Sequence, residues 1–127
     1  MTLAELQQAC KVWQERLRLQ GWIVGLHIVP ATELGDVDVQ GRTYFQDTHK
    51  WARILICDDH HFATNQQHKW PEHDDQEETL VHELLHLHFQ PLHIAADCPE
   101  ATAEELAINC LAKALVALGR VIPQKKE

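Results

Sequence analysis

Residues 77–89 read Glu-Glu-Thr-Leu-Val-His-Glu-Leu-Leu-His-Leu-His-Phe, and the stretch from His82 to His86 is an H-E-x-x-H motif. Residues four positions apart lie on the same face of a helix, so His82 and His86 can offer imidazole nitrogens to one tetrahedral metal ion. Glu83 stands beside them. The motif therefore predicts a metal-binding helix, and the rest of the chain can be placed around it.

The motif suits hydrolysis with the help of zinc. A zinc ion held by three protein ligands keeps a fourth position for water and lowers the pKa of that water toward neutrality. A neighbouring carboxylate can then take the proton during attack, and Glu83 is the expected general base. We expect one zinc ion per chain.

Apolar residues surround the motif. Leu80, Val81 and Leu84 make the segment strongly apolar and predict that the helix is buried. Histidine and glutamate side chains buried without partners would cost several kcal/mol, and metal coordination removes that cost. The competing interpretation is a surface helix whose histidines find other hydrogen-bond partners.

Length and charge limit the classes of protein to consider. The 127 residues suffice for one domain, 1–127, with a modest core. The net charge of −8 disfavours nucleic-acid binding, which requires contacts that neutralise phosphate. The start lacks a signal-peptide pattern, and no apolar run approaches the roughly 20 residues of a membrane span. We therefore expect a cytoplasmic protein that binds neither nucleic acid nor a membrane.

The four cysteines are dispersed and form no C-x-x-C pair. In a cytoplasmic protein such cysteines are typically small buried hydrophobic residues rather than disulfide partners. We expect Cys57 and Cys110, which fall within predicted regular elements, to be reduced and buried.

The N-terminal part of the chain predicts a helix followed by a strand. Thr2 and Glu5 have the spacing of a capping box, and apolar residues then recur at helical spacing, which predicts a helix over 3–20. Residues 22–29 are rich in β-formers, with alternate apolar residues on one face, and predict a first strand that ends before Pro30.

Two further strands are expected at 37–45 and 51–57. The second alternates, with Ala52 and Ile54 on one side. Residues 47–50 between the strands are turn-forming, so the strands should pair antiparallel as a hairpin.

A polar segment, 58–75, precedes the motif and predicts a long surface loop that could cover a cleft. Asp74 or Asp75 can cap the motif helix, and Pro91 marks the end of that helix. The loop also contains histidines that can be solvated side chains or, less favoured, an accessory metal site, because their spacing is irregular. They are His60, His61, His68 and His73.

The last element is expected to be a helix that opens at Asp97-Cys98-Pro99-Glu100, with an N-cap, an early proline and a glutamate at capping-box distance. It should run to about Leu118, before Gly119. The residues after it, about 121–127, are charged and are expected to be a mobile tail. The apolar stripe of this last helix is predicted to be Leu111, Ala114, Leu115 and Leu118.

A third metal ligand must come from outside the motif. An extension with glycine and histidine at 89 and 92 is excluded, because Phe89 and Leu92 stand there. The last helix carries Glu105 and Asn109, which share a face because they are four residues apart. Glu105 is the expected metal ligand, and Asn109 is expected to orient a ligand through a hydrogen bond.

Two neighbouring residues are the competitors for the ligand position. Adjacent helical residues point about 100° apart, so Glu104 is expected to face solvent if Glu105 faces the metal. His93 lies beyond Pro91 and is interpreted as a polar loop residue.

At these residues the chain resembles the gluzincin metallopeptidases, which follow H-E-x-x-H with a helical glutamate and a polar residue four positions on, like Glu105 and Asn109. More closely, Glu-Thr-Leu-Val-His-Glu-Leu-Leu-His and Glu-Glu-Leu-Ala-Ile-Asn resemble the small phage and prophage zincin-like metallopeptidases related to the ImmA/IrrE-type peptidases. The resemblance covers the C-terminal half. It implies that an edge strand beside the cleft pairs with an extended substrate, and 51–57 is the candidate.

Together these patterns predict an α+β minimal zincin-like fold, with an N-terminal helix, a small three-stranded sheet, the H-E-x-x-H helix and a ligand-bearing C-terminal helix. The expected function is zinc-dependent hydrolysis of a peptide or protein substrate. Two alternatives stay open: a non-catalytic, zinc-stapled phage or prophage adaptor or regulatory binding module, and a hydrolase acting on a non-peptide amide. Tyr44, His88 and His93 are the candidates to stabilise the oxyanion.

Overall fold

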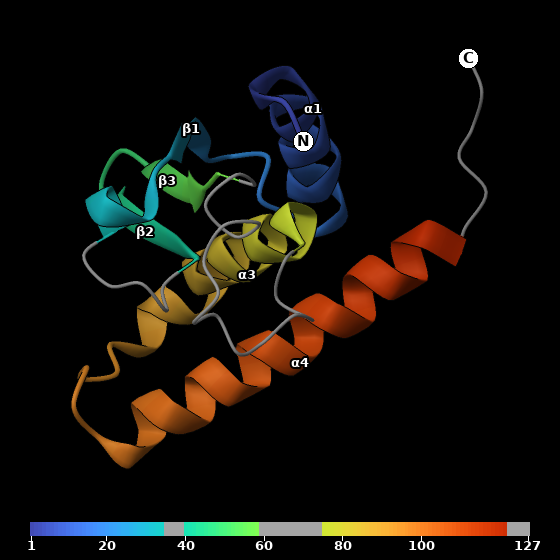
Figure 1. Ribbon diagram of the computed structural model, residues 1–127. Helices are drawn as coiled ribbons and strands as arrows, with labels where there is room; N and C mark the ends of the chain where they lie inside the picture. The colour runs from blue at the N-terminus through green and yellow to red at the C-terminus, as the bar shows by residue number, and fades with distance from the viewer. Residues whose placement is uncertain (35–39, 59–74, 122–127) are drawn as a thin grey trace.

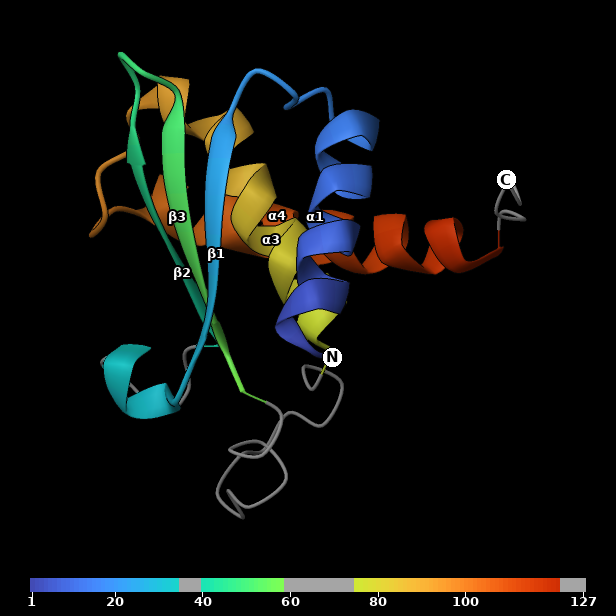
Figure 2. The same cartoon turned by 90° about the horizontal axis from the view of Figure 1, so that it is seen from above.

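A three-stranded sheet is covered on one face by helices in the computed structural model of the protein, which describes residues 1–34, 40–58 and 75–121. Figures 1 and 2 show the α-helices gathered on one side of the sheet. The fold is α+β, as the sequence predicts. The α-helices are α1 (Leu3–Arg16), α3 (Gln76–Phe89) and α4 (Pro99–Val121), the strands are β1 (Ile23–Val29), β2 (Gly41–Gln46) and β3 (Trp51–Cys57), and short 3-10 turns are η1 (Ala31–Leu34) and η3 (Gln90–Leu92).

The sheet has the order β1-β3-β2. β2 and β3 pair antiparallel through the turn at 47–50, which confirms the predicted hairpin. β1 pairs parallel with the other side of β3, where Leu26 is opposite Ile54. The expectation that 51–57 is an edge strand is therefore wrong. β3 is the central strand, paired with β1 on one side and with β2 on the other, and its apolar residues Ile54 and Ile56 are fully buried in the core under the helices. β2 is the edge strand nearest the motif helix.

Helix α3 lies at the centre of the described structure and contacts α1, α4, β2 and β3. Leu80, Val81 and Leu84 are completely buried in the main core. Asp75 caps the helix by accepting a hydrogen bond from the Glu78 amide at 3.1 Å, as predicted. The burial expected for the H-E-x-x-H helix is therefore confirmed.

Helix α1 begins as predicted and ends earlier than predicted. The side chain of Thr2 accepts from the Glu5 amide, and the Glu5 carboxylate accepts from the Thr2 amide, which completes the capping box. The helix ends at Arg16 rather than near residue 20, because Arg18 adopts a left-handed backbone conformation with φ of 62°. The chain then turns into β1.

Helix α4 is longer than predicted and buries a different face. It continues through Gly119 to Val121, since Gly119 is a packing residue and not a helix terminator. A Cβ at Gly119 would lie 2.9 Å from the Arg16 guanidinium and 3.2 Å from the Trp13 ring, so the missing side chain lets α4 approach α1. The residues that α4 buries are Ile108, Ala112, Val116 and Gly119.

The stripe predicted for α4 is therefore largely wrong. Leu115 packs against the core, but Ala114 is exposed, and Leu111 and Leu118 are 42% and 56% exposed. Cys110 is also exposed rather than buried, because it lies on the same outward face. Several predictions concern residues outside the described ones. They are the loop between its end positions 58 and 75, the cap alternative Asp74, the part of the expected strand before residue 40, the tail from 122, and the loop histidines His60, His61, His68 and His73.

Among the described residues, no helix has both the length and the apolar composition needed to cross a membrane.

Gly41 allows β2 to pass close to α3. A Cβ there would lie 2.9 Å from the Thr79 methyl carbon, 3.1 Å from Glu83 Cγ and 3.1 Å from the Leu55 carbonyl oxygen. We expect Gly41→Ala to lower the free energy of unfolding by about 1–3 kcal/mol, as overpacked cores do. Urea denaturation measures this change. Gly25→Ala is the matched control, because its nearest neighbours lie at 3.9 Å, and equal stability of the two variants would contradict the packing role of Gly41.

The four cysteines differ in accessibility although all are free thiols. Cys10 and Cys57 are buried, and burial raises the pKa of the Cys10 thiol to about 11. We expect Cys98 and Cys110 to react rapidly with a thiol reagent in the native protein, and all four to react after unfolding. Timed thiol counting tests this expectation. Fewer than four thiols in freshly prepared, unfolded protein would contradict it.

Candidate metal centre

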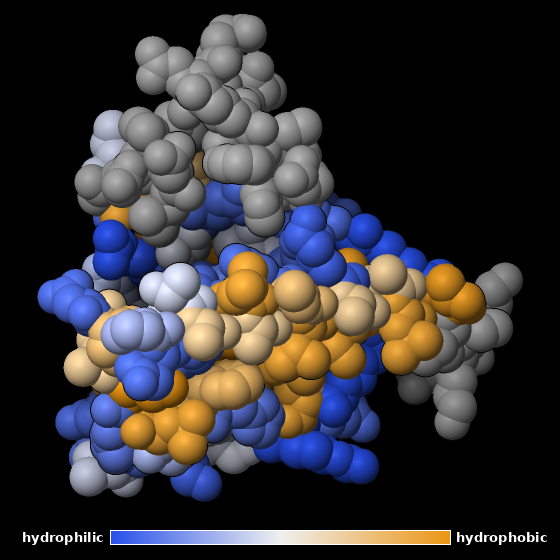
Figure 3. Space-filling model, turned by 90° about the horizontal axis from the view of Figure 1, so that it is seen from below, coloured by the Kyte–Doolittle hydropathy of each residue, from blue (hydrophilic) through white to orange (hydrophobic). Residues whose placement is uncertain are grey.

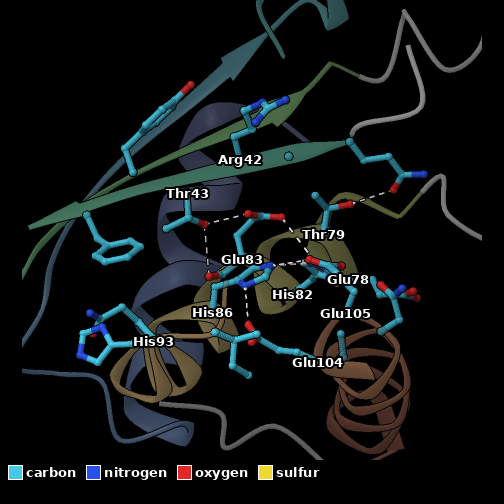
Figure 4. Close-up of a pocket in the computed structure, with 18 residues that line it drawn as sticks. Arg42, Thr43, Glu78, Thr79, His82, Glu83, His86, His93, Glu104 and Glu105 are labelled. Atoms are coloured by element: carbon cyan, nitrogen blue, oxygen red, sulfur yellow. Dashed lines mark hydrogen bonds and ion pairs between the residues drawn. The ribbon is translucent and has the colours of Figure 1, made fainter. Parts of the chain in front are cut away.

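A cleft of about 960 Å³ opens between β2, α3 and α4. β2 forms the wall of the cleft on the sheet side. The residues of the opposite wall that carry the candidate site belong to α3 and α4. Figure 4 shows His82 and His86 directed toward the glutamates of α4, and Glu83 directed toward Thr43 of β2. The residues of the motif and the predicted third ligand thus come from separate elements and meet in one cleft.

His82, His86 and Glu105 form a group that can hold a metal ion. The Nε2 atoms of the two histidines are 3.3 Å apart. One oxygen of Glu105 is 3.1 Å from His82 Nε2, and the other is 2.9 Å from His86 Nε2. Ligand atoms around a tetrahedral zinc ion, each about 2.0–2.1 Å from it, are separated by about 3.3 Å. The spacing of these three side chains therefore fits a small tetrahedral ion.

Local structure explains why the two histidines converge. One helical turn of α3 separates them, so both side chains lie on the face that α4 covers. Their side chains are 16% and 25% exposed, which leaves the ring edges accessible from the cleft. Glu105 reaches over from α4 and is half exposed. A metal ion held here would therefore join α3 to α4 at the mouth of the cleft.

Electrostatics favours a charged Glu105. The hydrogen bonds that its carboxylate accepts from His82 and His86 lower its pKa well below the usual range, and this effect outweighs burial. Burial lowers the pKa of His86, but the hydrogen bond to Glu105 and the nearby carboxylates raise it by more. In the protein without metal, an ionised carboxylate thus faces two imidazoles. A cation bound by all three would take over the role of the imidazole protons.

Glu83 is the most buried carboxylate of the site, with 6% of the residue exposed. One of its oxygens is 3.8 Å from His82 Nε2. Burial raises the pKa of Glu83, and this effect exceeds the opposing effects of His82 and His86. A carboxylate with a raised pKa beside a metal group is a suitable proton acceptor.

Thr43 of β2 holds Glu83 in place, a role that the sequence analysis did not identify. Its hydroxyl donates a 2.7 Å hydrogen bond to Glu83 Oε1, and the Glu83 carbonyl oxygen is 3.3 Å away (Figure 4). A threonine in a strand is an ordinary β-former, so nothing local distinguished Thr43 from its neighbours. Only the approach of β2 to α3 gives this residue its role.

The expectation that Glu104 faces solvent is wrong. Its side chain is 16% exposed, less than that of Glu105, and its Oε1 lies 3.6 Å from His86 Nδ1. Adjacent residues of α4 can both reach His86, because the two nitrogens of an imidazole ring lie on different edges. Glu105 faces Nε2 and Glu104 faces Nδ1. Glu104 is thus placed to orient His86 from behind, as carboxylates commonly orient metal-binding histidines.

Asn109 lines the cleft together with the ligand residues. The contacts described for His82, His86 and Glu105 do not include Asn109, and its role in orienting a ligand stays a prediction. The neighbour with a described contact to a ligand histidine is Glu104.

The three oxyanion candidates take different positions. His93 lies in the lining of the cleft but apart from the metal group (Figure 4). Tyr44 borders the cleft with its strand, but its ring packs against the Arg53 guanidinium at 4.9 Å. The ring of His88 is 2.6 Å from the Leu17 carbonyl oxygen and does not line the cleft. His93 is therefore the candidate that borders the cleft with a side chain that makes no such contact to any residue the structure describes.

We expect His82→Ala, His86→Ala and Glu105→Ala each to abolish stoichiometric zinc binding, since two-ligand sites bind weakly. Glu104→Ala should weaken the affinity about 10- to 100-fold, as loss of an orienting carboxylate does. Competition with a chromogenic zinc chelator measures these affinities. His93→Asn is the control and should bind zinc like the wild type; asparagine tolerates the left-handed conformation of this residue, φ of 51°. Stoichiometric, tight zinc binding by Glu105→Ala would contradict the ligand assignment.

In comparisons with known proteins, no protein-family model, curated protein or solved structure matches this chain. The chemistry of the site therefore has to be inferred from its own residues.

Proposed function

We propose that the protein is a zinc-dependent metallopeptidase that uses Glu83 as its general base. The observation that carries the proposal is the position of a buried carboxylate, Glu83, 3.8 Å from a histidine nitrogen of the metal-binding group, at an open cleft. Two imidazoles and one carboxylate are a donor set of catalytic zinc sites, which keep one coordination position for water or substrate. A purely structural site would have no need of an additional carboxylate held beside it.

A zinc ion in this position would polarise a substrate carbonyl group and lower the pKa of a water molecule. The protein residues supply the remaining functions. Glu83 accepts the proton of the attacking water, and its raised pKa makes it able to pass that proton to the leaving amine. Thr43 donates a hydrogen bond to one carboxylate oxygen of Glu83, so the other oxygen is directed toward the metal group.

The cleft wall formed by β2 supports an extended peptide as the substrate. β2 is an edge strand that pairs with β3 on one side, and its residues from Gly41 to Phe45 line the cleft. An extended chain can add to such an edge through main-chain hydrogen bonds, which do not depend on side-chain identity. This strand takes the place that the sequence analysis assigned to 51–57.

The second candidate is a binding module in which zinc joins α3 to α4 without catalysis. It is favoured by the origin of the ligands, because Glu105 bridges from one helix to two histidines of another. The two candidates differ in the role of Glu83. A structural site requires only His82, His86 and Glu105, whereas hydrolysis also requires Glu83.

We expect Glu83→Gln to retain zinc and fold but to lose about 10²–10⁴-fold in turnover, because the amide preserves the shape and cannot accept the proton. Digestion of a peptide library by zinc-loaded protein, followed by mass spectrometry, measures turnover. Glu15→Gln is the matched control, since it removes one exposed carboxylate of α1 and leaves the site intact. Equal cleavage by wild type and Glu83→Gln would exclude Glu83 as the base, and a zinc-loaded wild type that cleaves no peptide would favour the binding module.

A further inference from the structure

Helix α4 has a second apolar face that none of the described residues of the protein covers. Its inner face buries Ile108, Ala112 and Val116 against the core. On the outward face, Leu106, Leu111, Leu118 and Val121 are 65%, 42%, 56% and 78% exposed. Figure 3 shows this surface as a continuous orange and pale-orange band along the helix. We define the outer face of α4 by these four residues and two exposed alanines between them, Ala107 and Ala114.

The outer face carries no charge. Between Leu106 and Leu118 the sole charged residue of α4 is Lys113, which is half-buried and lies at the margin of this face, seven positions after Leu106. The helix thus lacks the polar outward side that a surface helix normally has, although 24% of the residues of the chain are charged. A contiguous apolar surface of this kind typically marks a protein interface.

The spacing of the residues is that of a helix–helix seam. Ala107, Leu111, Ala114, Leu118 and Val121 follow one another at intervals of four, three, four and three. This is the repeat with which two helices pack side chains of one into gaps of the other. Alanine alternates with leucine, so a leucine of one helix can pack over an alanine of another and the backbones can approach closely.

We propose that two copies of this chain associate through the outer faces of their α4 helices. The six side chains of the outer face expose at most roughly 600 Å² per copy, so a pair could bury up to roughly 1,200 Å², which is the lower limit of stable, specific interfaces. The charge distribution is compatible with the same partner. Two copies that each carry a net charge of −8 repel one another over most of their surface, and an uncharged face lets them meet without burying an unpaired charge.

A two-fold arrangement with antiparallel helices satisfies both the spacing and the helix dipoles. Ala114 lies near the middle of the outer face, so a two-fold axis close to it places Leu111 and Leu118 of each copy on either side of the axis. Antiparallel helices also bring the positive end of each helix dipole beside the negative end of the other. Neither the metal group nor Glu83 takes part, so the association is independent of the proposed function.

Sedimentation equilibrium of the zinc-loaded protein from about 1 to 300 μM tests the proposal. We expect a monomer–dimer equilibrium for the wild type, and at least a 100-fold weaker association for the double variant Leu111→Lys/Leu118→Lys. Lysine is the appropriate substitution because it brings the net charge closer to zero, so weaker association cannot arise from greater overall repulsion. Circular dichroism and zinc content verify that the variant is folded.

The matched control is Ile23→Lys, which places a lysine at a residue that is 66% exposed on β1, outside α4. We expect it to associate like the wild type. A second variant, Ala114→Cys in a Cys98→Ser/Cys110→Ser background, should form a covalent dimer under mild oxidation, because the two-fold axis brings the two positions together. Three outcomes would each overturn the proposal. The wild type could stay monomeric over the whole concentration range, it could bind lipid vesicles as a monomer instead, or Ile23→Lys could lose as much association as Leu111→Lys/Leu118→Lys.

Discussion

The burial of α3 is the constraint on which the rest of the structure depends. This helix must hide a strongly apolar surface, with Leu80, Val81 and Leu84 completely buried, and it also carries His82, Glu83 and His86. A helix with apolar residues nearly all round is stable only when other elements cover it. The sheet, α1 and α4 each cover part of it, and the one part left partly open is the cleft.

The buried polar side chains of α3 are acceptable in this setting because they have partners outside the helix. Thr43 of β2 donates to the Glu83 carboxylate, and Glu105 of α4 accepts from both histidines. Gln76 donates to the Cys57 carbonyl oxygen at the end of β3. Unpaired buried polar groups are costly, so these contacts position the elements as well as the side chains. The site and the fold are thus stabilised by the same interactions.

Small residues set how closely the surrounding elements can approach. Gly41 lets β2 pass over α3, which brings Thr43 within reach of Glu83, and Gly119 lets α4 cross the Trp13 ring. Arg120, the next residue of α4, pairs with Asp75 and Glu77 at the start of α3. The two ends of the α3–α4 contact are therefore held by charged groups, with apolar packing between them.

What the sequence determined by itself was local: the capping box at Thr2, the hairpin turn at 47–50, the buried faces of the strands and the shared face of His82 and His86. Each of these depends on side chains within a few positions of one another, where the helical or strand period alone specifies direction. Glu105 was also identified, because a missing ligand narrowed the search to one helix. The tertiary structure decided which strand is central, that Glu104 turns toward His86, and which of two apolar faces α4 buries. Those outcomes depend on how closely distant elements approach, and a helix with apolar residues on both sides contains no local signal that says which side will meet the core.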